Sequence, residues 1–313
     1  MTSHVVFIAG STRSGTTVLR LILDHHSEIC VPGELEWALD FNPPSGAASM
    51  RAYRDALEVN RGFHHSKVVV DENLELDDLI RSFLAQMKHR SGPEKLIVGA
   101  QIHDHYAGFL RLWPEARFLH IVRDGRDVCA SWLLRGWVGT GYRGGQRWSK
   151  VIEQWQCVKN QIPAERVLEI RFEDLVEDAP TNVSRICAFL GVEYEPGMLE
   201  YWRDTTYGPV SAREARKWRE TLKPRQVQLF ETTAAAWLVH YGYPLSGLPK
   251  HLVGPVEQRL LEIEDQIQRA RVDVKQFGFR LWVGEQLTRR LGPRILHRYC
   301  LSRQDNVIES GLK

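Results

Sequence analysis

The 313-residue sequence has none of the features that would place it in a membrane, in a disulfide scaffold or on a nucleic acid. No apolar stretch approaches the roughly 20 residues that span a bilayer, which argues against a transmembrane helix. The N-terminus lacks a basic segment followed by an apolar core, so no signal peptide is predicted. None of its five cysteines forms a CxxC pair, and a net charge of +2 gives no indication of a nucleic-acid partner. These absences predict an intracellular, cytoplasmic protein with reduced thiols.

A further absence lies in the sequence FIAGSTRSGTTVLR at residues 7–20. An apolar run leads into a glycine, four residues follow, and then comes Gly15, as in the phosphate-binding loop GxxxxGK[ST]. The lysine that would reach the terminal phosphates is replaced by threonine. An anion can still bind, because the free N–H groups and the dipole at a helix start attract negative charge. Arg13 adds a cation, and Thr16 and Thr17 add hydroxyl donors. The alternative is a glycine-rich strand–helix turn without a ligand.

Apolar runs alternate with helical patterns along the chain. Nearly continuous apolar runs predict buried strands at residues 5–9, 96–100, 117–122 and 166–171. Apolar residues at three- and four-residue steps predict helices at 74–90, 145–162, 181–190 and 224–240. Strands that alternate with helices indicate an α/β fold whose parallel sheet is flanked by helices.

Two segments depart from this alternation. Residues 42–66 contain two prolines, a glycine and scattered Arg and His, which predicts a loop with irregular helix, of the kind that forms a lid or a substrate wall. After GYPLSGLP the helical periodicity resumes. We therefore predict an α/β domain at 1–245 and a helical C-terminal extension at 246–313.

A second candidate anion site is FLHIVRDGRDVCASWLLR at residues 118–135. The predicted strand ends at Arg123, and Ser131 and Arg135 lie four residues apart on one face of the helix that follows. An Arg–Ser–Arg pocket would hold a second phosphate. The alternative is a strand–helix junction whose surface arginines pair with neighbouring aspartates. Two anion-binding turns on two strands of one sheet favour the phosphate interpretation.

Together these motifs resemble those of the sulfotransferases that use 3′-phosphoadenosine-5′-phosphosulfate (PAPS). STRSGTT is similar to their 5′-phosphosulfate loop and VRDGRDVCASWLLR to their 3′-phosphate motif, within a resemblance that covers roughly residues 5–245. Arginine in the loop is closer to the carbohydrate, tyrosylprotein and bacterial branches than to the phenol and steroid branch. The resemblance implies a P-loop-like fold, PAPS as cosubstrate, adenosine 3′,5′-bisphosphate (PAP) as product, and no metal. The cosubstrate-binding residues that it implies are Arg13, Ser14, Gly15, Thr16, Thr17, Arg123, Ser131 and Arg135.

The resemblance also implies the catalytic residues. In the tyrosylprotein and bacterial relatives a Glu directly after Gly is the general base, which maps to Glu34 in VPGELEW, with Glu36 as the second choice and ordinary surface carboxylates as the alternative. Arg13 and the loop amides would stabilise the leaving oxygen. Those relatives usually carry a lysine where this chain has Gln101, which is uncharged. We expect a protonated His103 or His105 to supply the missing positive charge. The HxH spacing of these two histidines could also indicate a metal site, but the sequence offers no matching third ligand.

Two further positions complete the predicted site. Phe172 falls where relatives carry a tyrosine that packs on adenine, although a core phenylalanine is equally common at a strand end. Lys217, in EARKWRETL, loosely matches a stretch that reaches the 3′-phosphate in the phenol and steroid branch.

The predicted reaction is in-line transfer of a sulfuryl group to a hydroxyl on a carbohydrate, lipid or secondary metabolite. Peptide tyrosine is the second candidate acceptor. The alternative function is that of a P-loop nucleotide kinase or a non-catalytic nucleotide-binding protein.

Residues 276–300 mix aromatic and aliphatic side chains with arginines. This segment either lies on an anionic membrane surface or packs on the core or on a second subunit of a homo-oligomer.

Overall fold

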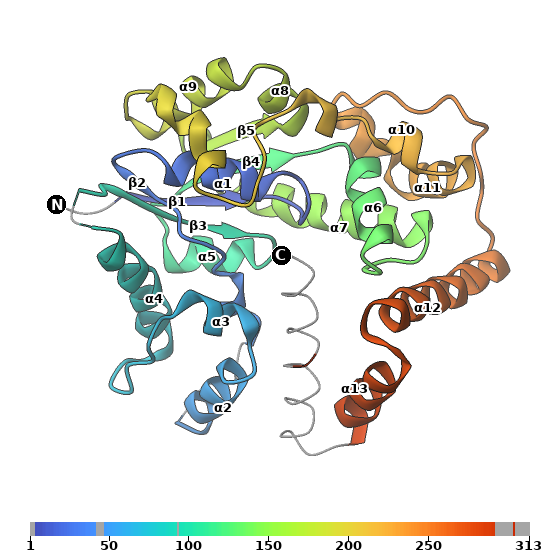
Figure 1. The fold of residues 1–313 in the computed structure, drawn as a ribbon, viewed down its shortest axis with the longest axis horizontal. Helices are drawn as coiled ribbons and strands as arrows, with labels where there is room; N and C mark the ends of the chain where they lie inside the picture. The colour runs from blue at the N-terminus through green and yellow to red at the C-terminus, as the bar shows by residue number, and fades with distance from the viewer. Residues whose placement is uncertain (1–3, 42–46, 93, 292–302, 304–313) are drawn as a thin grey trace. The chain divides into compact units, whose positions relative to one another are not determined.

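A computed structural model describes residues 4–41, 47–92, 94–291 and 303 (Figure 1). Its centre is a parallel sheet of five strands in the order β2-β3-β1-β4-β5. The strands are β1 (His4–Ala9), β2 (Ile29–Cys30), β3 (Ile97–Ile102), β4 (Arg117–Val122) and β5 (Val167–Arg171). The predicted α/β fold is confirmed. The chain moves to one side of β1 for β2 and β3 and to the other for β4 and β5, so a ligand crevice is expected at the carboxyl end of β1.

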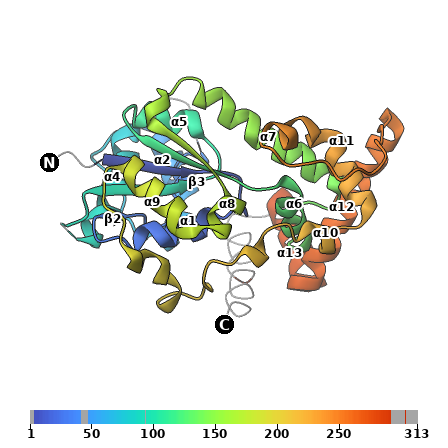
Figure 2. The same cartoon turned by 90° about the horizontal axis from the view of Figure 1, so that it is seen from above.

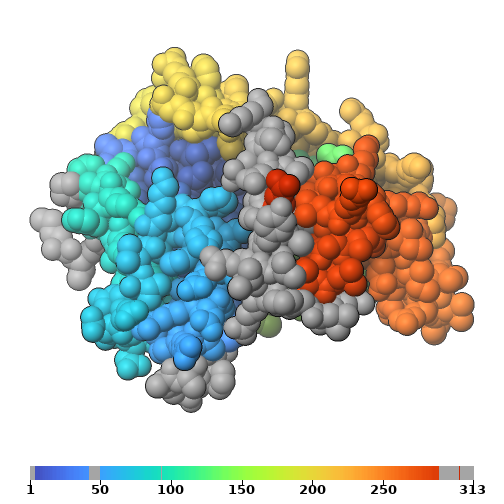
Figure 3. Space-filling model, turned by 60° about the horizontal axis from the view of Figure 1, so that its bottom comes forward, coloured from blue at the N-terminus to red at the C-terminus, as the bar shows by residue number. Residues whose placement is uncertain are grey.

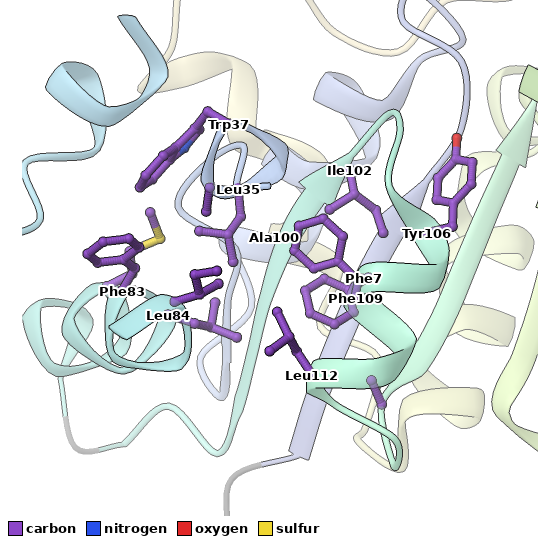
Figure 4. Close-up of a cluster of buried hydrophobic side chains, with 14 of the residues drawn as sticks. Phe7, Leu35, Trp37, Phe83, Leu84, Ala100, Ile102, Tyr106, Phe109 and Leu112 are labelled. Atoms are coloured by element: carbon purple, nitrogen blue, oxygen red, sulfur yellow. The ribbon is translucent and has the colours of Figure 1, made fainter. Parts of the chain in front are cut away.

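Successive side chains of β1 point into two separate cores, which explains why its sequence is continuously apolar. Phe7 and Ala9 pack with α4 (Leu76–Ser91), α5 (Tyr106–Leu112) and the last turns of α7 (Gly141–Lys159). Figure 4 shows Phe7 beside Phe109 and Leu112 in this cluster. Val6 and Ile8 pack with α1 (Thr16–Asp24), α8 (Phe172–Glu177) and α9 (Ala179–Leu190). Figure 2 shows α1 and α5 on opposite sides of the sheet.

The predicted strands and helices are found with shifts of a few residues at their ends. The largest shift in a strand is at β3, which runs to Ile102 and so includes Gln101. Residues 42–66 are more regular than predicted, because α2 (Ala47–Leu57) and α3 (Arg61–Ser66) occupy most of the described part. Asn60 caps α3 by accepting a hydrogen bond from the N–H of Phe63 at 3.2 Å, a local signal for a helix start.

The chain folds into two compact units. The first contains residues 1–128 and 148–219, and with them the whole sheet and both cores. The second contains residues 129–147 and 220–313, including α11 (Pro224–His240), α12 (Pro255–Phe277) and α13 (Phe279–Leu291). Helices α6 (Gly125–Leu134), α7 and the short α10 (Trp218–Thr221) run from one unit into the other. Helices α12 and α13 follow residue 245, and they share their unit with residues from before that boundary. The helical extension at 246–313 and its division from the rest at 245 stay predictions.

Candidate active site

The loop after β1 turns into α1 through two residues in the left-handed region. Arg13 has φ +72° and Gly15 has φ +93°, and Gly15 is the N-cap of α1. Left-handed backbone is strained for a residue with a side chain and is typical of functional turns. The first N–H groups of α1 have no acceptor within the helix, and a turn of this kind before a helix is typical of anion-binding loops.

Arg123, directly after β4, joins this loop to the second predicted motif. Its Nη1 donates to the carbonyl oxygen of Arg13 at 3.2 Å, and its Nη2 donates to that of Glu214 at 2.5 Å. Its guanidinium lies 4.5 Å from the ring centroid of Phe172. A Cβ on Gly15 would overlap the same ring, so the glycine lets Phe172 lie against the loop.

These contacts surround a cavity of about 260 Å³. Six of the predicted cosubstrate-binding residues line it, namely Arg13, Gly15, Thr16, Thr17, Arg123 and Phe172. Phe172 is buried, so it serves the core and the cavity wall together. Residues 207–211 and Glu214 form another part of the wall.

The residues present fit a bisphosphate. The hydroxyl of Ser14 is buried and, within the described part of the chain, has no hydrogen-bond partner. Nε of Arg123 makes no hydrogen bond there either, but it is ion-paired with Oδ2 of Asp127 at 3.8 Å. Buried polar atoms normally have hydrogen-bond partners, so the Ser14 hydroxyl indicates a polar ligand. Lys217 does not line the cavity; its Nζ donates to Glu214. Ser131 and Arg135 belong to the second unit, and their place beside Arg123 stays a prediction.

Asp127 is a functional candidate that the sequence analysis did not single out. Its carboxylate accepts the backbone N–H of Arg216 at 2.8 Å and that of Trp218 at 2.7 Å. Burial raises the pKa of Asp127 to about 6. Both arginine–aspartate pairs of the predicted alternative are present, since Arg126 pairs with Asp124 and Nε of Arg123 lies 3.8 Å from Oδ2 of Asp127. Arg126 is buried, however, and does not lie at the surface as that alternative expected. The motif VRDGRD thus holds the segment that forms one wall of the cavity.

The candidate bases lie on a segment that continues beside β3. Gln101 and Glu34 form a parallel bridge, in which Gln101 donates its N–H to the carbonyl of Gly33 at 2.9 Å and accepts from Leu35 at 3.1 Å. The side chain of Gln101 is buried, and its Nε2 has no hydrogen-bond partner in the described part of the chain.

His103 connects the phosphate loop to both candidate bases. Its Nδ1 lies 2.9 Å from the carbonyl oxygen of Gly10, and its Nε2 lies 3.6 Å from Oε1 of Glu34. Its backbone N–H donates to Oε2 of Glu36 at 3.0 Å. His105 instead pairs with Asp40, at 3.3 Å. Of the two histidines predicted to compensate for Gln101, His103 is therefore the one beside the bases and the loop.

The charges of this group follow from its contacts. Burial lowers the pKa of His103, but Glu34, Glu36 and the Gly10 carbonyl outweigh it and raise the pKa to about 9. The pKa of Glu34 is lowered by its interaction with the His103 ring. Partial burial raises the pKa of Glu36 to about 7. At neutral pH His103 is a cation beside an ionised Glu34.

The described residues contain neither a membrane-spanning helix nor a metal-binding cluster. None of their helices is long and apolar enough to span a bilayer. No group of three or more His, Cys, Asp or Glu side chains among them is placed to hold a metal ion. The predicted membrane contact of residues 276–300 falls in part on residues 292–300, which lie outside the described residues.

Comparison with known proteins decides the family. The model of the sulfotransferase family matches residues 5–196, which is more than half of the chain. This chain belongs to the sulfotransferase family. The match confirms the predicted family and enzyme class, does not favour the kinase alternative, and supports PAPS as the sulfuryl donor.

This sulfotransferase is similar to curated proteins that act on tyrosine. It is 26% identical over 206 residues to protein-tyrosine sulfotransferase 2 of Gallus gallus, covering 63% of this chain and 53% of that protein. It is 25% identical over 290 residues to protein-tyrosine sulfotransferase 1 of Danio rerio, covering 82% and 78% respectively. Among solved structures, the sulfotransferase domain from the curacin biosynthetic pathway matches with a TM-score of 0.60 and 21% identity, covering 78% of this chain and 99% of that domain. The structural likeness confirms the fold.

Proposed function

We propose that this sulfotransferase moves the sulfuryl group of PAPS onto a hydroxyl acceptor at the cavity between the loop after β1 and the end of β4. The contact of Arg123 with Arg13 carries the proposal, because it brings two anion-binding motifs to one cavity. Arg13, Ser14, Gly15, Thr16 and Thr17 would hold the 5′ side. Arg123 would hold the 3′-phosphate together with Ser131, which lies in α6, and Arg135, which follows α6 directly.

PAPS, when bound, supplies a sulfuryl group on a good leaving group. The chain then has to position the two substrates, neutralise the charge on the leaving oxygen and take the proton from the acceptor hydroxyl. Arg13 and the first N–H groups of α1 would neutralise charge at the leaving oxygen. The protonated ring of His103 would supply the cation that Gln101 cannot. Since Nδ1 of His103 lies against Gly10, the ring is held where the phosphate loop begins.

The acceptor hydroxyl needs a base, and Glu34 is the better candidate. Its side chain is exposed and ionised, so one carboxylate oxygen can receive the proton. Glu36 has the pKa nearer neutrality, but its Oε2 already accepts the N–H of His103. We therefore assign Glu36 to positioning His103 and keep it as the second candidate base.

The acceptor is proposed to be a hydroxyl on a carbohydrate, lipid or secondary metabolite. Peptide tyrosine is the second candidate, favoured by the names of the curated relatives. A panel of labelled-PAPS reactions with members of each class separates them by which one takes up the label.

The cosubstrate is tested by thermal shift, because a ligand that binds only the folded state raises the melting temperature. We expect PAP to stabilise the protein strongly and ATP with magnesium to stabilise it little. Stabilisation by ATP with magnesium and none by PAP would return the assignment to the kinase alternative.

A further inference from the structure

Helix α12 carries an exposed apolar stripe. Val256, Leu260, Ile263 and Ile267 are 77%, 60%, 46% and 47% exposed. They follow one another at steps of four, three and four residues, and Ala270 and Val274 continue the same steps. Alternating steps of three and four residues are the spacing of the a and d positions in a coiled-coil seam. Figure 3 shows part of the surface of α12 in orange.

The opposite side of α12 is already occupied within the second unit. Leu261 is buried with Tyr142 and Leu229. Oδ1 of Asp265 accepts the N–H of Gly139 at 2.6 Å, and a Cβ on Gly139 would overlap the backbone of Asp265. At about 100° per residue, these anchors and the exposed stripe lie on roughly opposite sides of the helix. The stripe is therefore not needed to hold α12 in its own unit.

Charged residues flank the stripe in a self-complementary order. At the flanking positions of the heptads lie Glu257, Glu264 and Arg271 on one side, and Arg259, Gln266 and Asp273 on the other. In an antiparallel pair of α12 helices, Glu257 meets the partner's Arg271 and Arg259 meets the partner's Asp273, each twice by symmetry. In a parallel pair only Arg259 meets an opposite charge, the partner's Glu264. Two copies of Glu264 come close in the antiparallel pair. Within one chain Glu264 pairs with Arg225 at 3.5 Å, Glu257 with His251 at 2.9 Å and Arg259 with Glu262 at 3.0 Å, so the cross-pairs would share these partners.

We propose that this stripe is a homodimer seam, in which α12 of a second copy of the chain packs antiparallel on α12. One surface that complements itself is what a two-fold axis requires. The apolar pairs across the seam are Val256 with the partner's Val274, Leu260 with the partner's Ala270, and Ile263 with the partner's Ile267. The seam lies on the second unit, whereas the cavity and the candidate bases lie on the first.

Light scattering coupled to size exclusion tests the seam on the full chain. The wild type should have about twice the 36.1 kDa mass of one chain at micromolar concentration. The variant with Leu260→Glu and Ile263→Glu should have half the wild-type mass at an unchanged melting temperature, because both side chains are exposed in one copy. Val239→Glu on α11, which replaces another exposed apolar side chain of the same unit, should stay dimeric. A monomeric wild type, or a dimer that survives the double substitution, would overturn the proposal.

Charge reversal tests the antiparallel direction. Arg259→Glu should weaken the dimer, and adding Asp273→Arg to the same chain should restore it, because both members of each cross-pair are then exchanged. In a parallel pair the second substitution would not face the first and would restore nothing. Failure of this rescue would therefore overturn the antiparallel arrangement.

Discussion

Arg123 donates a hydrogen bond from Nη1 to the carbonyl oxygen of Arg13, 110 residues earlier in the chain, at 3.2 Å. The contact holds the guanidinium beside the loop after β1, and its Nε is ion-paired with Oδ2 of Asp127 at 3.8 Å. A phosphate at this place would gain a charge-assisted bond.

Replacing Arg123 by Ala should therefore weaken PAP binding by roughly 1.5–3 kcal/mol, as measured by calorimetry. Arg117→Ala is the matched control, because Arg117 lies at the other end of β4 and donates to the carbonyl of Leu190 at 2.7 Å. The control should bind PAP as the wild type does. Equal affinities of the two variants would show that the 3′-phosphate lies elsewhere.

Gly15→Ala should lower the free energy of unfolding in a urea titration. The new methyl group would overlap the ring of Phe172, and overpacking of this kind costs roughly 1–3 kcal/mol. The left-handed backbone at φ +93° adds to the loss. Gly197→Ala is the control, since a Cβ there meets nothing within 4 Å. The explanation fails if the two variants are equally stable.

Glu34→Gln should lower kcat by roughly 10²–10⁴-fold, the share of a general base, and leave PAP affinity intact. Glu36→Gln should have a smaller effect, because the amide oxygen can still accept the N–H of His103 at the position now held by Oε2. Single-turnover rates with labelled PAPS measure both. If Glu36→Gln shows the larger loss, the base is Glu36.

The pKa of His103 is raised from 6.5 to about 9 in the folded protein, so protonation favours folding. Its contribution to stability should be complete below pH 6.5 and be lost as the pH rises through about 9. The difference in melting temperature between the wild type and His103→Gln should therefore be largest near pH 6 and shrink by about pH 9.5. A difference that does not change with pH would contradict a charged His103.

Asp127→Ala should release the backbone of Arg216 and Trp218, whose N–H groups it accepts. The segment that includes Ser211 and Glu214 should then be cut faster by a protease, and PAP should bind more weakly, because these residues line the cavity. Limited proteolysis with and without PAP, followed by mass mapping of the cuts, measures both effects. Unchanged cleavage within 205–219 would show that Asp127 does not hold this segment.

The local properties of this protein were already determined by its sequence. Continuous apolar runs specified the main strands of a parallel sheet, since both faces of such a strand are covered. The glycine-rich turn after β1 and Arg123 at the end of β4 were predictable, because each depends on neighbours along the chain. The family followed from the same two motifs, and the family model confirmed it.

Only the tertiary structure decided which distant residues meet. Phe172 lies between Gly15 and Arg123 because β5, from which α8 starts, is placed beside β4. His103 reaches Gly10 because β3 pairs with β1, and it reaches Glu34 because the segment after β2 continues along β3. Asp127 meets the backbone of residues 216 and 218 across 89 and 91 positions of sequence. Periodicity reports the environment of a residue but not its partner, since the partner is set by strand order and by the packing of helices on the sheet.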